Sequence, residues 1–259
     1  MAYHSEELFK FAYFPKYHEQ IEYLAEYLAA PEKWDFSDIR TKEYAILKNY
    51  LEHTFRRLKK EEKISFTRDN NFACFNTGLV TRNYEDIHAF FEKNKNPETT
   101  PFCFKAFKKE SDQEIILHFS ENLPDRANYF DEPELLIFNP KCEIIYDIDH
   151  ILENISRFPN RLRSADEATL RREIAGAIDE TKKRVKTNYK LAVPQYYQNK
   201  IQLLLPLWLT PGSPNPDLAL AVEKVKGSCK YSARTCLTLK MAYNNARLIV
   251  KPEADWLQP

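Results

Sequence analysis

Residues 200–239 read KIQLLLPLWLTPGSPNPDLALAVEKVKGSCKYSARTCLTL and decide the fold of the C-terminal part of the chain. They contain three apolar runs, KIQLLLPLWL, LALAVEKV and KYSARTCLTL, which are separated by a proline-rich turn and by the short link KGS. Runs of this kind between turn residues are typical of strands. Because short links join antiparallel neighbours, the stretch predicts a three-strand antiparallel meander, which a terminal amphipathic helix then closes.

The residues before the meander alternate between helical and strand-like patterns. The expected helices cover residues 18–30, 42–60, 84–94 and 166–189, and the expected strands cover 72–80, 101–109 and 114–120. Ser164 and Glu167 have capping-box spacing and mark the start of the longest helix. These patterns predict an α+β fold, in which a mainly antiparallel sheet that includes the meander packs with several helices.

Charge is distributed unevenly along a chain whose formal net charge is zero. Residues 157–259 contain 18 Lys and Arg against 9 Asp and Glu, and the rest contains 20 against 29. The polar segment RFPNRLRS, 157–164, therefore separates an acidic α+β part, 1–156, from a basic part, 157–259, within one compact unit. The basic part could offer a surface to a polyanion, or the two parts could complement each other's charge.

Composition excludes several classes of protein. Only four glycines occur, far apart, which rules out a GxGxxG dinucleotide loop and a Walker A loop. The five cysteines are dispersed without a CxxC pair, so we expect buried reduced thiols, no metal site and no cofactor. No secretory signal opens the chain, and its longest apolar run is too short for a bilayer, so we expect a cytoplasmic protein without membrane association.

The terminal helix carries a polar stripe. Lys240, Asn244, Arg247 and Lys251 follow each other at spacings of four, three and four residues, which places them on one helical face. Two cations with an amide between them suit a phosphate or the edge of a base. The alternative is a solvated stripe whose asparagine holds a neighbouring loop.

Three other segments carry candidate binding residues. In VPQYYQNK, Tyr197 and Lys200 could stack on a base and contact its phosphate, or could serve only as edge packing. In FNTGL, Asn76 and Thr77 hold either a turn at Gly78 or a ligand. In DRANYF, Arg126 and Tyr129 lie in an acidic loop, where the arginine could also pair with an aspartate.

A fourth segment, YDIDH, could carry catalysis. Asp147 and Asp149 alternate in what reads as a strand, so both would face one side and could hold magnesium for phosphoryl chemistry, with Glu223 as a further carboxylate. A DxD pair at a strand end is also common without any function. Whether the chain is an enzyme stays open at this point.

The blocks FNTGLVT, DRANYF, QYYQNKIQLLLPL, LALAVEKV and MAYNNARLIVKP together resemble the DUF3825 family of bacterial proteins. The resemblance extends from about Phe11 to Leu257, and the last block is the most specific. One departure is Lys240, where the family pattern has an aspartate. The resemblance implies that relatives occur alongside RNA-binding modules, which favours RNA as the partner but gives no mechanism.

The resemblance also selects polar residues within apolar blocks, which we expect to converge on one cleft between the meander and the N-terminal half. They are Asn76, Thr77, Arg126, Tyr129, Gln195, Tyr197, Lys200, Tyr243, Asn244, Asn245 and Arg247. The first hypothesis is a protein that binds RNA or a nucleotide in RNA metabolism or a stress response. The alternatives are a metal-dependent phosphoesterase or nuclease acting on the same ligands, and a structural module that docks a protein partner.

Overall fold

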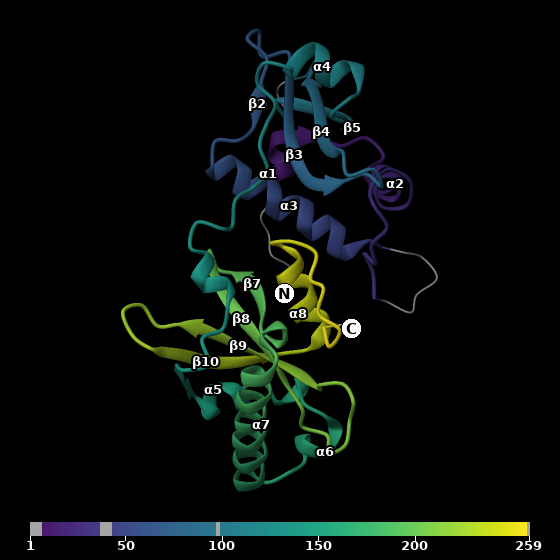
Figure 1. Ribbon diagram of the computed structural model, residues 1–259. Coiled ribbons are helices and arrows are strands. Elements are labelled where there is room, and N and C mark those ends of the chain that lie inside the picture. The colour runs from purple at the N-terminus through teal and green to yellow at the C-terminus, as the bar shows by residue number, and fades with distance from the viewer. Residues whose placement is uncertain (1–6, 37–42, 97–98, 258–259) are drawn as a thin grey trace. The chain divides into compact units, whose positions relative to one another are not determined.

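The computed structural model describes residues 7–36, 43–96 and 99–257, and its contacts divide the chain into two compact units, Met1–Asn128 and Tyr129–Pro259 (Figure 1). We call these the N-terminal and the C-terminal unit and describe each by itself. The division lies at 128/129 and not in segment 157–164, because strand β6 (Glu143–Tyr146) pairs with the last strand of the chain. Residues 129–156 therefore belong to the C-terminal unit.

This division removes most of the expected charge asymmetry. The C-terminal unit contains 19 Lys and Arg against 16 Asp and Glu, and the N-terminal unit contains 19 against 22. The acidic residues between 131 and 153 fold together with the basic part of the chain and largely neutralise it. A strongly basic half is thus no longer an argument for a polyanionic ligand.

The N-terminal unit is a five-stranded sheet of order β1-β5-β4-β3-β2, in which only the β1–β5 pair is parallel. Its elements are α1 (Glu7–Phe11), β1 (Ala12–Tyr13), α2 (Tyr17–Tyr23), η1 (Leu24–Leu28), α3 (Ala45–Lys60), β2 (Ser65–Phe66), β3 (Phe72–Val80), β4 (Asp86–Lys93), β5 (Phe102–Lys109) and α4 (Gln113–Phe119). Helix α3 packs on one face, where Phe55 lies 5.4 Å from Phe75 between ring centroids. Helix α4 covers the opposite face, where Phe119 meets Phe90.

Two of the predictions for this unit are wrong, and they lie on either side of strand β5 in the chain. The expected helix 84–94 is strand β4, because both of its faces are covered by side chains and apolar residues are needed on each. The expected strand 114–120 is helix α4. Only Ile115 and Phe119, four residues apart, are buried there, whereas Leu117 is 71% exposed. Strand β3 and helix α3 are as predicted, although Lys42 lies outside the described residues.

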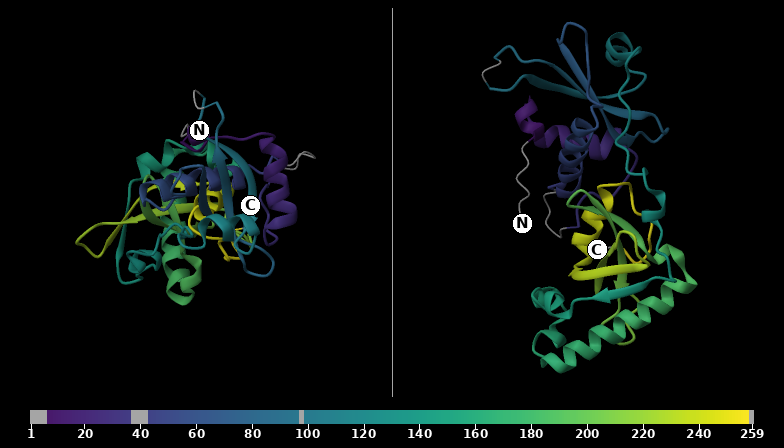
Figure 2. Two further views of the ribbon diagram at one scale, coloured as in Figure 1. Left: turned by 90° about the horizontal axis from the view of Figure 1, so that it is seen from above. Right: turned by 90° about the vertical axis from the view of Figure 1, so that its left-hand side faces the viewer.

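The C-terminal unit is a second five-stranded sheet, of order β6-β10-β9-β8-β7, in which only the β6–β10 pair is parallel. Its elements are η2 (Pro133–Leu136), β6, α5 (Ile148–Leu152), η3 (Ile155–Arg157), α6 (Asn160–Arg163), α7 (Glu167–Thr187), η4 (Tyr189–Leu191), β7 (Val193–Tyr197), β8 (Lys200–Leu207), β9 (Leu218–Lys224), β10 (Lys230–Leu237) and α8 (Leu239–Arg247). Figure 2 shows α7 and α8 on opposite faces of this sheet. The α+β class, the meander β8-β9-β10 and the terminal helix are confirmed.

The sequence signals at two element ends were misread. Helix α7 begins at Asp166, whose carboxylate accepts the backbone N–H of Thr169 at 3.0 Å, and not at a capping box that uses Ser164. Residues 193–197 form a strand of their own, because Gln198 and Asn199 both have positive φ and close a two-residue hairpin into β8.

Cysteine usage also differs from the expectation of five reduced thiols. Cys142 and Cys229 form a disulfide across the β6–β10 edge, while Cys74, Cys103 and Cys236 are free. None of the helices in the described ranges combines the length and the apolar character that a membrane crossing requires.

Candidate functional site

The residues singled out by the sequence fall into one group in each unit. Asn76, Thr77 and Arg126 belong to the N-terminal unit. The C-terminal unit holds Tyr129, Gln195, Tyr197, Lys200, Tyr243, Asn244, Asn245 and Arg247. The common cleft that would join the two groups stays a prediction, and each group is therefore described within its own unit.

The N-terminal group is organised around Asp86, which sequence reasoning missed. Asn76 on β3 donates from Nδ2 to Asp86 Oδ2 at 2.7 Å, and Arg126 donates to both carboxylate oxygens, with its Nε 3.2 Å from Oδ2. Burial would raise the pKa of Asp86, but the hydrogen bonds from Arg126 and Asn76 outweigh it and hold this pKa below its ordinary value. Arg126 thus has a carboxylate partner, which reduces its readiness to bind phosphate.

His88 is the other unexpected member of this group. It lies directly across from Asn76 in the β3–β4 ladder and has no exposed surface. Neither ring nitrogen makes a hydrogen bond of normal geometry. Burial lowers the pKa of His88, so the ring is neutral at pH 7. The alternation of DIHAFFEK, once β4 is accepted as a strand, places Asp86 and His88 on one face and could have revealed both.

Asn76 and Thr77 hold the backbone of β3 at Gly78. The side-chain oxygen of Asn76 accepts the N–H of Gly78 at 2.9 Å, which is the Asx-type contact weighed from the sequence. The hydroxyl of Thr77 donates to the carbonyl of Ile87 at 2.6 Å and accepts the N–H of Leu79 at 3.2 Å. Both side chains are buried, so these contacts serve the local structure of β3.

The C-terminal group contains a continuous chain of hydrogen bonds that we call the polar row: Asn245, Gln195, Gln202, Glu223 and Lys200. Asn245 Nδ2 donates to Gln195 Oε1 at 3.1 Å, and Gln195 Nε2 donates to Gln202 Oε1 at 2.8 Å. Gln202 Nε2 then donates to Glu223 Oε2 at 3.2 Å, and Lys200 Nζ donates to Glu223 Oε1 at 2.6 Å. The row thus links helix α8 to strands β7, β8 and β9.

Strand register explains why these residues meet. Gln195 pairs with Gln202 across β7 and β8, and the pairing of Leu203 with Val222 sets Gln202 opposite Glu223. All three side chains therefore stand on one face of the sheet, the face that α8 covers. The two-residue turn after β7 fixes this register, so Gln202 could have been found from the sequence once that turn was recognised.

Exposure increases along the row. Gln195 is 1% exposed, whereas the side chains of Glu223 and Lys200 are 36% and 62% exposed. The hydrogen bond from Lys200 is the main reason that the pKa of Glu223 lies below its ordinary value, so this carboxylate is ionised at neutral pH. The buried end of the row consists of amides and the open end is charged.

The other aromatic and basic candidates of the C-terminal unit are more buried than a ligand-contacting role would require. Tyr129, Tyr243 and Arg247 are 6%, 4% and 4% exposed, and the ring of Tyr129 meets Tyr196 edge-on at 5.2 Å. Tyr197 and Asn244 are half-buried. Helix α8 ends at Arg247, so Lys251 does not share its stripe, and Lys240 is exposed near the helix start.

Asp147 and Asp149, proposed for metal binding, do not lie on a strand. Asp147 is the N-cap of α5, where it accepts the N–H of His150 at 3.2 Å, and Asp149 pairs with Arg171 of α7. Glu223 lies in the polar row on the face of the sheet opposite α7. Within the described ranges, no three His, Cys, Asp or Glu side chains are grouped as metal ligands would be. The metal-dependent phosphoesterase or nuclease stays an untested hypothesis.

The protein is of the α+β class, with two mostly antiparallel sheets that each carry helices on both faces. The polar row runs across the sheet of the C-terminal unit. The chain belongs to the DUF3825 family: the family model, a domain of unknown function, matches residues 25–256. That match crosses the division at 128/129, so both units are part of the family's domain. No curated protein and no solved structure is significantly similar to the chain.

Proposed function

We propose that the protein binds RNA or a nucleotide, and that the ligand contacts the open end of the polar row in the C-terminal unit. The observation that supports this proposal most directly is the hydrogen-bonded row itself. It begins with the buried amide of Gln195, continues through Gln202 and Glu223, and ends at the exposed Lys200. Buried amides are costly unless they are hydrogen-bonded, and an apolar strand pair would need none of them.

The chemistry of the row suits a base. A side-chain amide has one carbonyl and two N–H groups, and both kinds of group match the edges of nucleobases. Gln202 uses one N–H for Glu223 and its carbonyl for Gln195, which fixes the orientation of the remaining N–H. Tyr197, half-buried on the same face beyond Gln195, offers an aromatic ring for stacking.

The charged end suits a phosphate beside that base. Lys200 pairs with Glu223, and the charge of Arg234 on the neighbouring strand also acts on this carboxylate. An exposed ion pair contributes at most about 1 kcal/mol, so a phosphate can replace Glu223 as the partner of Lys200 at little cost. The carboxylate, once freed, can accept a ribose hydroxyl.

The test is fluorescence anisotropy of a labelled single-stranded RNA at low and moderate salt, with a mononucleotide as competitor. We expect Lys200→Met to weaken binding about three- to tenfold and to reduce the salt slope by roughly 0.7, the share of one phosphate contact on a single strand. Competition by the mononucleotide would identify a nucleotide site, and its failure would leave RNA as the ligand.

Lys186→Met is the matched control, because Lys186 is an exposed lysine on α7, on the other face of the same sheet. The substitution should leave the affinity unchanged. If no RNA or nucleotide binds, or if Lys186→Met weakens binding as much as Lys200→Met does, the polar row is not the contact site.

A further inference from the structure

The disulfide between Cys142 and Cys229 lies at a chemically asymmetric position. Glu143 pairs with Lys230 in the parallel β6–β10 ladder, which places the two cysteines opposite each other just before the paired strands. Cys142 is 7% exposed, whereas Cys229 is exposed at the end of the β9–β10 hairpin. A solvent-borne nucleophile can therefore reach one of the two sulfurs more readily than the other.

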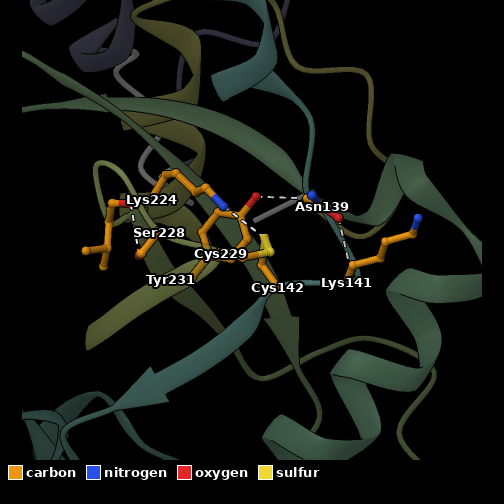
Figure 3. Close-up of a disulfide and its surroundings, with 8 residues drawn as sticks. Asn139, Lys141, Cys142, Lys224, Ser228, Cys229 and Tyr231 are labelled. Carbon is orange, nitrogen blue, oxygen red and sulfur yellow. Dashed lines mark hydrogen bonds between the residues drawn. A yellow bond between two sulfur atoms is a disulfide. The ribbon is translucent and has the colours of Figure 1, made fainter.

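A lysine contacts the buried sulfur. Lys224 Nζ lies 2.9 Å from Cys142 Sγ and 4.8 Å from the centroid of the Tyr231 ring. Figure 3 shows Lys224 pointing toward the sulfur of Cys142 beside the ring of Tyr231. The ring is held by stacking on Phe138 at 4.8 Å and by its hydroxyl, which accepts the backbone N–H of Asn139 at 2.9 Å. An ammonium group so placed favours the thiolate form of Cys142 over the thiol.

The same lysine lines a cavity of about 650 Å³. Lys224, Lys226 and Gly227 of the hairpin form one side, and Phe138 and Tyr231 lie among the other lining residues. A cavity of this size accommodates a small peptide-like molecule. Glu132 and Glu134 also line it and balance the charge of the two lysines. Lys224 thus contacts Cys142 and also lines this cavity, whereas Cys229 is open to solvent.

From these contacts we propose that Cys142–Cys229 is a site of reversible thiol–disulfide exchange with a low-molecular-weight thiol, in which Cys229 is attacked and Cys142 leaves. The thiolate of the small molecule bonds to Cys229 Sγ, the S–S bond breaks, and its electron pair remains on Cys142 Sγ beside Lys224. A second small thiolate then attacks the small-molecule sulfur of this mixed disulfide. It releases Cys229 as thiolate and leaves as the oxidised small-molecule disulfide.

The step balances without any further reactant. Two thiols lose two electrons and form one disulfide, the protein disulfide gains those electrons, and the two protons pass to the cysteine thiolates through solvent. The reverse sequence re-forms the bond. The inference does not rest on the proposed RNA or nucleotide binding, because Cys142, Cys229 and Lys224 are not members of the polar row.

The first experiment equilibrates the full chain, carrying Cys103→Ser to remove the half-buried free thiol, with mixtures of reduced and oxidised glutathione. Thiols are then alkylated after denaturation and counted by mass spectrometry. We expect a transition between two and four alkylated cysteines, and peptide mapping that finds the glutathione adduct on Cys229. A chain that forms no disulfide in any mixture, or an adduct confined to Cys142, would overturn the proposal.

The second experiment compares Lys224→Met with Lys186→Met in the rate of reduction by glutathione at pH 7. We expect about a three- to tenfold slower reduction for Lys224→Met, because the leaving thiolate loses its ammonium partner. Lys186→Met should stay within about twofold of the parent, since Lys186 is an exposed lysine of α7 that does not line the cavity. Equal rates in all three chains would exclude the assigned role of Lys224, and circular dichroism establishes that each variant is folded.

Discussion

Gly78 is the backbone position at which the structure predicts the clearest effect of a single substitution. Its φ of +72° lies in the left-handed region, and a Cβ added there would fall inside van der Waals contact with the hydroxyl oxygen of Tyr50. That hydroxyl donates to the carbonyl of Thr77 at 2.9 Å. Gly78→Ala therefore imposes a strained conformation and also displaces a buried hydrogen-bond donor.

The cost can be worked out from these two effects. A non-glycine residue in the left-handed region costs roughly 1–2 kcal/mol, and the lost hydrogen bond costs about 1 kcal/mol. We expect Gly78→Ala to lower the free energy of unfolding by about 2–3 kcal/mol. In a Tyr50→Phe background the clashing oxygen is absent and the nearest ring carbon, Cζ, lies at 3.7 Å, an ordinary contact, so only the strain of about 1–2 kcal/mol remains.

The assay is a double-mutant cycle on Tyr50 and Gly78, measured by urea unfolding, with hydrogen exchange of the β3 peptides to locate the effect in the N-terminal unit. The loss of unfolding free energy in the double variant should be smaller, by about 1 kcal/mol, than the sum of the losses in the two single variants. Gly212→Ala is the control for strain alone, because its φ is +75° and no atom lies within 4 Å of the added Cβ. Additive effects of Tyr50→Phe and Gly78→Ala would refute the clash argument.

Two further predictions concern buried polar groups. Burial, with the charges of Arg56 and Arg57, lowers the pKa of His53 to about 4. The unfolded state binds the proton from about pH 6.5 downward, so the free energy of unfolding of the N-terminal unit should fall by about 3 kcal/mol between pH 6.5 and pH 4. His53→Gln should flatten this part of the plot of unfolding free energy against pH. An unchanged plot would contradict the lowered pKa. Gln195→Leu leaves two amide partners unsatisfied and should lower the free energy of unfolding of the C-terminal unit by about 1–3 kcal/mol, measured in urea. Lys200→Met, at an exposed residue, should lower it by less than about 1 kcal/mol. Equal losses would show that the row does not stabilise the fold.

Helix α7, which has one buried face, was predicted correctly from its periodicity. In α7, Leu170, Ile174, Ile178 and Val185 are all buried, as their helical spacing required. The meander was recognisable because proline and glycine separate its strands. The errors occurred where periodicity carries little information. Strand β4 is apolar on both faces, so Ile87 and its neighbours fitted a helical stripe as well as a strand.

The candidate site was predictable in composition but not in geometry. Sequence reasoning identified the polar residues around Asn245 and Gln195, but the hydrogen-bond partner of each depends on the strand register. A register shift of one residue moves every side chain of a strand to the other face of the sheet. Gln202 was passed over because it stands within an apolar strand, and Glu223 was considered only as a metal ligand. Asp147 was placed on a strand, although a carboxylate just before a short helix also reads as an N-cap.

The polar row also shows how structural and ligand-binding roles of a block such as QYYQNK can be separated. A residue kept for the fold should affect stability when it is replaced, and a residue kept for a ligand should affect affinity alone. Gln195 is buried and hydrogen-bonded at both ends, so its substitution changes the fold first and any affinity only indirectly. Lys200 is exposed and pairs with a carboxylate that a phosphate can replace, so a loss of binding without a loss of stability is expected there. The contrast between Gln195 and Lys200, measured in one set of proteins, therefore decides whether the row only holds α8 on the sheet or also presents a binding surface.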